Sequence, residues 1–196
     1  MKKGTLITLV VLAAVALIAI WGFGQYNSLV TQQETVESAW AQVENQYQRR
    51  ADLVPNLVNT VKGYAAHEQN TLDAVVEARS KATSIQLNAD NLSEENLKAF
   101  ESAQNELSSA LGRLIAISEA YPDLKANENF SKLQDQLEGT ENRITVARNE
   151  FNKTAKEYNT FVRRFPTNIV ANLCNFERKA YFAAAEGADK APTVEF

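Results

Sequence analysis

An apolar run near the N-terminus is the feature that most limits how this chain can fold. No charged residue occurs between Lys3 and Glu34, and the 18 residues 6–23 are almost entirely apolar. As an α-helix they extend for about 27 Å, at about 1.5 Å per residue, which is close to the hydrocarbon thickness of a bilayer. The run therefore predicts a transmembrane helix at residues 5–25, in contact with the lipid bilayer, after a short N-terminal segment of residues 1–4.

A cleaved secretory signal peptide is the alternative interpretation, because it also has a basic start and an apolar stretch. Its apolar region is usually shorter, and small residues mark its cleavage site. Here the run ends in bulky residues, and the rings of Trp21 and Tyr26 suit the membrane–water interface. We therefore predict an uncleaved anchor. A lipoprotein is excluded because the only cysteine is Cys174.

The basic residues around the run predict its orientation. Lys2 and Lys3 precede it, and the next basic residue is Arg49. Because basic flanks tend to stay in the cytoplasm, residues 1–4 are predicted to be cytoplasmic and the following domain to be exported. In a bacterium with two membranes, that domain is periplasmic. The single cysteine fits either compartment.

The composition of the remaining chain is that of one helical domain. Lys2 and Lys3 apart, 18 basic residues stand against 24 acidic ones, and the two signs are interspersed. There is no basic stripe, so we predict no nucleic-acid partner. Only seven glycines and four prolines interrupt 196 residues, which favours long helices and makes a sheet improbable.

Apolar residues at alternating steps of four and three predict where the long helices lie. The first stretch, residues 26–85, carries such a seam at Val36, Trp40, Val43, Tyr47, Val54, Leu57, Val61 and Tyr64. Pro55 removes a backbone donor inside this stretch, so we expect a kink or break near Asp52–Pro55, or a new helix capped by Asp52.

Capping residues and prolines bound the later helices. Ser93 predicts the start of a second helix that ends near Tyr121, and Asn127 caps a third. Pro166 stops the third helix, and a short fourth follows. The predicted fold is all-α: an N-terminal transmembrane helix, then an elongated antiparallel bundle of three long helices plus a short fourth over residues 26–185, and a flexible C-terminal tail at 186–196.

Several segments of the chain form specific motifs: Gln48-Arg49-Arg50-Ala51-Asp52-Leu53-Val54-Pro55-Asn56-Leu57-Val58, Tyr121-Pro122-Asp123-Leu124-Lys125-Ala126-Asn127, Leu137-Glu138-Gly139-Thr140-Glu141-Asn142-Arg143-Ile144 and Pro192-Thr193-Val194-Glu195-Phe196. These segments resemble the LemA family of bacterial single-pass membrane proteins. The resemblance spans nearly the whole chain. It implies a membrane helix with a helical bundle in the bacterial inner membrane, and it implies no settled biochemical activity and no fixed orientation.

Residues capable of catalysis or metal binding are sparse. His67, followed by Glu68, is the only histidine, whereas a zinc site needs three or four ligands. We therefore predict no catalytic residue, no metal and no cofactor. Cys174 is expected to be a small buried core residue, and a Cys–His pair with His67 requires the fold to bring the two together.

The candidate interaction residues lie mainly in the LemA-like segments: Arg49, Arg50, Pro55, Asn56, His67, Glu68, Val194 and Phe196. Arg50 interrupts the apolar seam, so it is either a surface residue or a seam residue paired with a carboxylate such as Asp52 or Glu141. Polar inserts, among them Asn45, Asn56, Asn59 and Asn142, are predicted to fix the helix register, with ligand binding as the alternative.

The last residues resemble a recognition signal. An apolar Phe196 with a free carboxylate, preceded by Val194, has the form that PDZ-type grooves capture by strand addition. The alternatives are a frayed end and an end docked on its own bundle.

These features together favour a membrane-anchored, non-enzymatic scaffold or interaction protein of the bacterial cell envelope, with itself or other envelope proteins as partners. A ligand- or peptide-binding envelope sensor or adaptor is the alternative, and an envelope enzyme ranks last because the sequence contains no recognisable nucleophile–base set.

Overall fold

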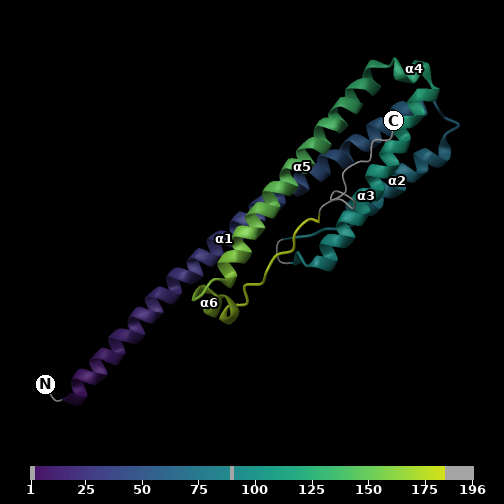
Figure 1. Ribbon diagram of the computed structural model, residues 1–196. Coiled ribbons are helices and arrows are strands. Elements are labelled where there is room, and N and C mark those ends of the chain that lie inside the picture. The colour runs from purple at the N-terminus through teal and green to yellow at the C-terminus, as the bar shows by residue number, and fades with distance from the viewer. Residues whose placement is uncertain (1–2, 89–90, 184–196) are drawn as a thin grey trace, which may run out of the picture.

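The computed structural model describes residues 3–88 and 91–183, and the regular secondary structure in these residues is entirely helical. The predicted all-α class is therefore confirmed. The elements, labelled in Figure 1, are α1 (Lys3–Lys62), α2 (Gln69–Ser84), α3 (Glu94–Ile117), the 3-10 helix η2 (Ser118–Ala120), α4 (Pro122–Lys125), α5 (Glu128–Arg163) and α6 (Thr167–Leu173).

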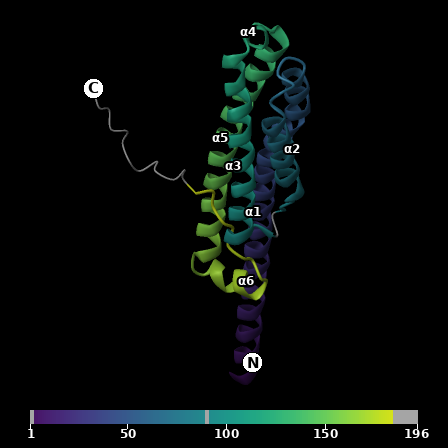
Figure 2. The same ribbon diagram turned by 90° about the vertical axis from the view of Figure 1, so that its right-hand side faces the viewer.

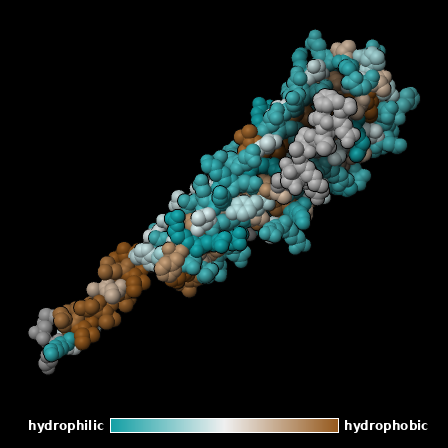
Figure 3. Space-filling view, in the orientation of Figure 1, coloured by the Kyte–Doolittle hydropathy of each residue, from teal (hydrophilic) through white to brown (hydrophobic). Residues whose placement is uncertain are grey.

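Helix α1 is a single rod of 60 residues, about 90 Å long at about 1.5 Å per residue. Its N-terminal part projects beyond the bundle and its surface is apolar, whereas the bundle surface is mostly polar (Figure 3). Among the described residues this is the one helix that is long and apolar enough to cross a membrane. The first fully buried side chain of α1 is Leu29, so the apolar segment passes into the bundle without a break.

The break expected near Asp52–Pro55 is wrong, because α1 continues through Pro55. Pro55 and Asp52 lie on the exposed face of α1, and Val54 and Leu57 are buried on the opposite face. Packing of that buried face holds the helix together although the proline lacks one backbone hydrogen bond. Asp52 caps no helix and instead accepts a hydrogen bond from Gln48.

Residues 26–85 form parts of two helices rather than one. Helix α1 ends at Lys62, next to Gly63, whose low helix propensity favours termination, and α2 begins at Gln69. The described chain therefore has four long helices, α1, α2, α3 and α5, one more than expected. The predicted caps are confirmed: Ser93 accepts from the backbone N–H of Asn96, and Asn127 from that of Phe130.

The long helices pack as two antiparallel pairs that lie side by side (Figure 2). Along α1 and α5, Trp40 packs against Phe151, and Arg50 pairs with Glu141. As the residue number rises on one helix it falls on the other, which defines an antiparallel pair. Helices α2 and α3 are antiparallel in the same way. We call the end from which the N-terminal part of α1 projects the base, and the end with α4 the tip.

Two hydrophobic clusters fill the bundle, one above the other. The base cluster includes Leu29, Val36, Trp40, Val43, Tyr47, Leu97, Phe100, Ile144, Phe151, Tyr158 and Phe182. The tip cluster includes Val54, Leu57, Val61, Leu72, Val75, Leu107, Leu111, Leu114, Leu124, Phe130 and Leu137. On α1, α3 and α5 alike, polar residues at one height along the bundle separate the two clusters: Arg50, Gln104, Ser108 and Glu141. We call this group the polar level, and it forms the candidate site.

Candidate functional site

Arg50 is the largest nearly fully buried side chain of the bundle, with 2% of its surface exposed. Its Nη1 donates to Glu141 Oε1 on α5 at 2.8 Å and to Ser108 Oγ on α3 at 2.6 Å. Its Nη2 donates to the backbone oxygen of Gln104 at 3.1 Å and also to that residue's side-chain oxygen. Only Nε is left without a hydrogen-bond partner among the described residues. The predicted pairing with Glu141 is confirmed, and the pairing with Asp52 is wrong.

The surroundings of Arg50 extend this polar level to all four long helices. The guanidinium carbon lies 5.1 Å from the centre of the Tyr47 ring, a cation–π contact. Gln104 donates to the backbone oxygen of Ala82 on α2 at 3.2 Å, and Arg79 of α2 donates to the backbone oxygen of Ala51 at 2.8 Å. Because these bonds form only in one register, the polar level fixes how the helices are aligned.

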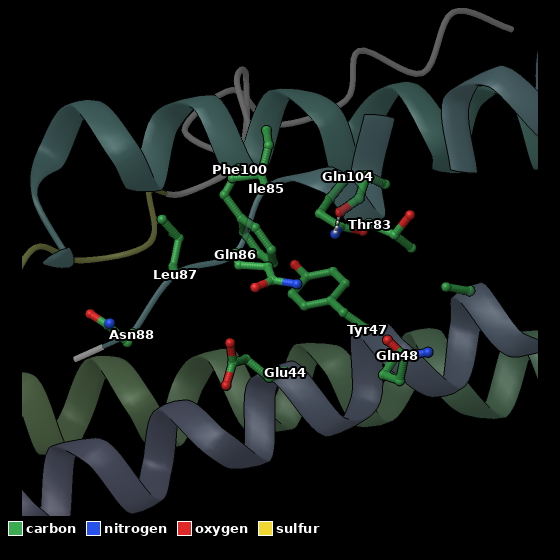
Figure 4. Close-up of a pocket in the computed structure, with 12 residues that line it drawn as sticks. Glu44, Tyr47, Gln48, Thr83, Ile85, Gln86, Leu87, Asn88, Phe100 and Gln104 are labelled. Carbon is green, nitrogen blue, oxygen red and sulfur yellow. Dashed lines mark hydrogen bonds between the residues drawn. The ribbon is translucent and has the colours of Figure 1, made fainter. Parts of the chain in front are cut away.

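A hollow of about 450 Å³ adjoins the polar level on the α2–α3 side (Figure 4). Glu44, Tyr47, Gln48 and Ala51 line it from α1, Phe100 and Gln104 from α3, and Ala82, Thr83 and residues 85–88 complete the wall. Burial raises the pKa of Tyr47, and burial also raises the pKa of Glu44. The lining residues offer hydrogen-bond donors and acceptors beside aromatic surface, a combination that can hold a small ligand or a peptide.

Sequence reasoning missed this hollow. Its walls come from three separate segments, residues 44–51, 82–88 and 100–104, and no spacing pattern connects them. Tyr47, which lines it, is predicted only as a seam position of the first helical stretch.

An aromatic cluster lies below the hollow, toward the base. The Trp40 ring lies 5.6 Å from Phe100 and 5.4 Å from Phe151, edge to face in both cases, and it stacks on Phe182 at 5.9 Å. The Trp40 indole N–H donates to the backbone oxygen of Leu87 at 3.1 Å. Trp40 therefore joins three helices, the α2–α3 connection and the segment that follows α6.

That segment is held to α5 by two asparagines. Asn159 donates to the backbone oxygen of Lys179 at 2.8 Å and accepts from its N–H at 2.9 Å. Asn152, two turns earlier on α5, makes the same pair of bonds with Phe182, at 3.0 and 2.8 Å. The side-chain amides thus replace the backbone partners that an extended segment finds in a sheet.

The other predicted interaction residues are not among the hydrogen-bond partners of Arg50. Arg49, Pro55 and Asn56 are exposed on α1, and His67 is exposed in the α1–α2 turn at the tip. Glu68, in the same turn, accepts a hydrogen bond from Tyr121 at 3.2 Å. Val194 and Phe196 lie outside the described residues, as does the whole predicted tail at 186–196. The role of these residues in binding a partner stays a prediction.

Two expectations about polar residues are wrong. Cys174 is exposed at the end of α6, near the base, so it is no core residue, and His67 lies at the tip, too far for a Cys–His pair. The candidate register asparagines, Asn45, Asn56, Asn59 and Asn142, are all exposed.

In the part of the chain that the structure describes, no three His, Cys, Asp or Glu residues gather in a way that could hold a metal ion.

Comparison with known proteins gives relatives along nearly the whole chain. It is 28% identical to magnetosome protein MamQ 2 of Paramagnetospirillum magneticum, over 94% of this chain and 74% of that protein. It is 28% identical to magnetosome protein MamQ of Magnetospirillum gryphiswaldense, over 84% of this chain and 67% of that protein. It is 27% identical to Protein LemA of Metamycoplasma hominis, over 83% of this chain and 71% of that protein.

The LemA family pattern matches residues 39–196. This range covers Trp40, Arg50 and Glu141, and with them the polar level and the aromatic cluster. The apolar N-terminal part of α1, which precedes the matched range, suggests membrane anchoring. The resemblance drawn from the sequence is therefore confirmed, and this chain belongs to the LemA family.

Proposed function

We propose that this protein is a membrane-anchored, non-enzymatic scaffold of the bacterial cell envelope, embedded in the inner membrane through residues 5–25. The observation that carries the proposal is the continuity of α1: one helix supplies both the exposed apolar segment and a long core-forming face of the bundle. A bundle built on its own anchor is held at a set height above the bilayer. Such a rigid support presents side surfaces to neighbouring proteins.

The contacts of Arg50 support a structural rather than a catalytic role. Both terminal nitrogens of its guanidinium already bind protein acceptors, so they have little capacity left for a substrate. Its position between two hydrophobic clusters is suited to fixing register, as polar residues do in coiled coils.

The orientation in this proposal is N-terminus inside, with the bundle on the outer side of the membrane. It is tested with an impermeant maleimide on spheroplasts that express single-cysteine variants in a Cys174→Ser background. Ala66→Cys, at the exposed tip, is expected to react in intact spheroplasts, and Gly4→Cys, in the segment before the span, only after permeabilisation. The reverse pattern would overturn the orientation.

Self-association is the second part of the proposal. A hollow of about 420 Å³ between α1 and α5 exposes mainly apolar surface, and its lining residues are Ala39, Val146 and Ala147 together with Gln42, Gln46, Asn142, Arg143 and Glu150. Copies anchored through the same helix share a plane and an orientation, and this hollow, halfway along the bundle, faces sideways within that plane. A second copy of this chain is therefore its proposed occupant.

The test of self-association is the mass of the detergent-extracted chain. Val146→Arg is expected to convert the oligomer to a monomer, because the larger side chain occupies the hollow into which the second copy would pack. Val76→Arg is the matched control: Val76 is also an exposed valine on a helix, but it lies on α2, away from the hollow. A monomeric parent chain, or equal masses for the two variants, would contradict this interface.

The hollow beside Tyr47 favours a ligand- or peptide-binding sensor or adaptor as the second candidate function. The exposed Gln86→Trp variant would fill that hollow with little effect on the core. A scaffold that does not use the hollow keeps its captured partners in cells after this change, whereas a sensor loses them.

A further inference from the structure

The base of the bundle is attached to α1 just after the apolar segment. The Thr167 hydroxyl of α6 donates to Gln25 Oε1 at 2.8 Å. The Tyr26 and Phe176 rings meet edge to face at 5.7 Å. Gln25 and Tyr26 follow the exposed apolar residue Phe23 almost directly. Helix α6 is thus fixed at the height where α1 leaves the predicted membrane span.

The outer face of this corner is apolar and uncovered. Phe165, Ile169 and Leu173 are 77%, 56% and 83% exposed, among the most exposed large apolar side chains of the bundle. They are spaced four residues apart, so Ile169 and Leu173 share one face of α6 and Phe165 precedes it. The opposite face, with Thr167 and Ala171, is buried against the bundle.

Figure 3 shows apolar surface at the position of α6, close to the apolar part of α1 and separate from the polar sides of the bundle. Arg163 and Arg178 lie beside α6, where they line a shallow hollow with Asn168, Asn172 and Glu177. Arginine guanidinium groups next to exposed apolar residues are typical of segments that lie in the interface of a membrane with anionic lipids.

We propose that the face formed by Phe165, Ile169 and Leu173 inserts into the headgroup–acyl boundary of the bilayer that α1 spans. This inference rests on the proposed anchoring of α1 and adds a second membrane contact beside it. The occupant is a lipid surface, because the face continues the apolar surface of α1 at the same height. Two contacts, one spanning and one interfacial, fix the tilt of the bundle as well as its height.

Spin labels on the full-length chain test the proposal in vesicles of three parts phosphatidylcholine to one part phosphatidylglycerol. Labels are placed on Leu173→Cys, Phe23→Cys and Ala66→Cys, each in a Cys174→Ser background. Collision rates are measured with oxygen, which concentrates in lipid, and with a nickel complex, which stays in water. All three positions carry exposed side chains, so the labels displace no core packing, and helical circular dichroism checks the fold.

The Leu173 label is expected to collide more with oxygen than with the nickel complex, as the Phe23 label does, while the Ala66 label at the tip shows the aqueous pattern. A Phe23 label in lipid with an aqueous Leu173 label would overturn the second contact and leave the anchor intact. Aqueous labels at both positions would overturn the anchor itself. A Leu173 label shielded from both reagents would mean that a protein surface, such as a second copy, covers α6.

Discussion

Arg50 of α1 and Glu141 of α5 form an ion pair of 2.8 Å at the level where the base cluster and the tip cluster meet. The two ends of the pair differ in environment, since the Arg50 side chain is 2% exposed and that of Glu141 is 42% exposed. Glu141 therefore neutralises a buried charge from a position that still contacts water. This asymmetry lets the bundle bury a guanidinium at a moderate desolvation cost.

Glu141→Gln is expected to lower the free energy of unfolding by about 1–2 kcal/mol, because Arg50 stays buried and loses its counter-charge. Urea unfolding of the detergent-solubilised chain, followed by circular dichroism, measures the change. Glu128→Gln is the control: Glu128 pairs with Lys132 at the surface, and its loss is expected to cost less than about 0.5 kcal/mol. Equal effects would show that the buried pair contributes no more than a surface pair.

Tyr158→Phe is expected to stabilise the protein. The Tyr158 side chain is fully buried, and among the described residues its hydroxyl has no hydrogen-bond partner. Burial raises the pKa of this tyrosine to about 12, with Glu177 adding to the rise. Removing an unpaired hydroxyl gains about 1 kcal/mol, which is about 2–4 °C in the thermal midpoint of a chain of this size.

Tyr121→Phe provides the contrast, because the Tyr121 hydroxyl donates to Glu68 and its loss is expected to lower the midpoint slightly. A lower midpoint for Tyr158→Phe would mean that its hydroxyl has a partner, such as a buried water.

Asn159→Asp is expected to loosen the segment that follows α6, because an aspartate carboxylate cannot donate to the Lys179 carbonyl. A loss of about 1–2 kcal/mol in local stability raises the open population about 5- to 30-fold. Native trypsin digestion measures the rate of cleavage after Arg178 or Lys179, which tracks that population. The control is Asn142→Asp on the exposed face of α5. If both variants are cut equally fast, packing of Phe182 holds the segment instead.

Glu101→Gln is expected to make the free energy of unfolding less dependent on pH. Burial raises the pKa of Glu101 above its ordinary value of 4.5, and the ion pair with Arg148 offsets only part of that rise. As the pH rises above 4.5, the unfolded chain gives up this proton before the folded protein does, so the free energy of unfolding falls until the folded carboxyl has also ionised.

Thermal midpoints measure this effect at pH 4.5, which is the ordinary pKa of the group, and at a neutral pH of about 7. The parent chain is expected to lose more stability over this interval than Glu101→Gln. Glu95→Gln, an exposed carboxylate on the same helix, controls for the loss of one charge. A parent and a variant with parallel profiles would show that Glu101 does not contribute.

Local patterns in the sequence predicted the helices well, because helices depend on nearby residues. The seam residues Val36, Trp40 and Val43 are buried, as their spacing indicates. The caps Ser93 and Asn127 are formed by side chains that bind backbone N–H groups three residues on. Local patterns failed at Pro55, where packing of the far face keeps the helix continuous.

The candidate site was predictable only in part. Arg50 was a candidate because it interrupts an apolar seam, and Glu141 was one of the two carboxylates suggested as its ion-pair partner. No local signal linked Ser108 or Gln104 to Arg50, because they meet Arg50 only after α3 packs beside α1. No local signal linked Asn152 or Asn159 to the segment after α6, because their partners Phe182 and Lys179 lie 30 and 20 residues further along the chain.

The sequence by itself determined that the chain is helical, that its first segment can span a bilayer, and that it resembles the LemA family. Each of these depends on composition or on short-range spacing. Only the tertiary structure decided which charge meets Arg50, where the hollow beside Tyr47 lies, and that α6 keeps Ile169 and Leu173 uncovered next to the apolar segment of α1. These features arise where segments distant in the chain are brought together, and the packing of whole helices sets those distances.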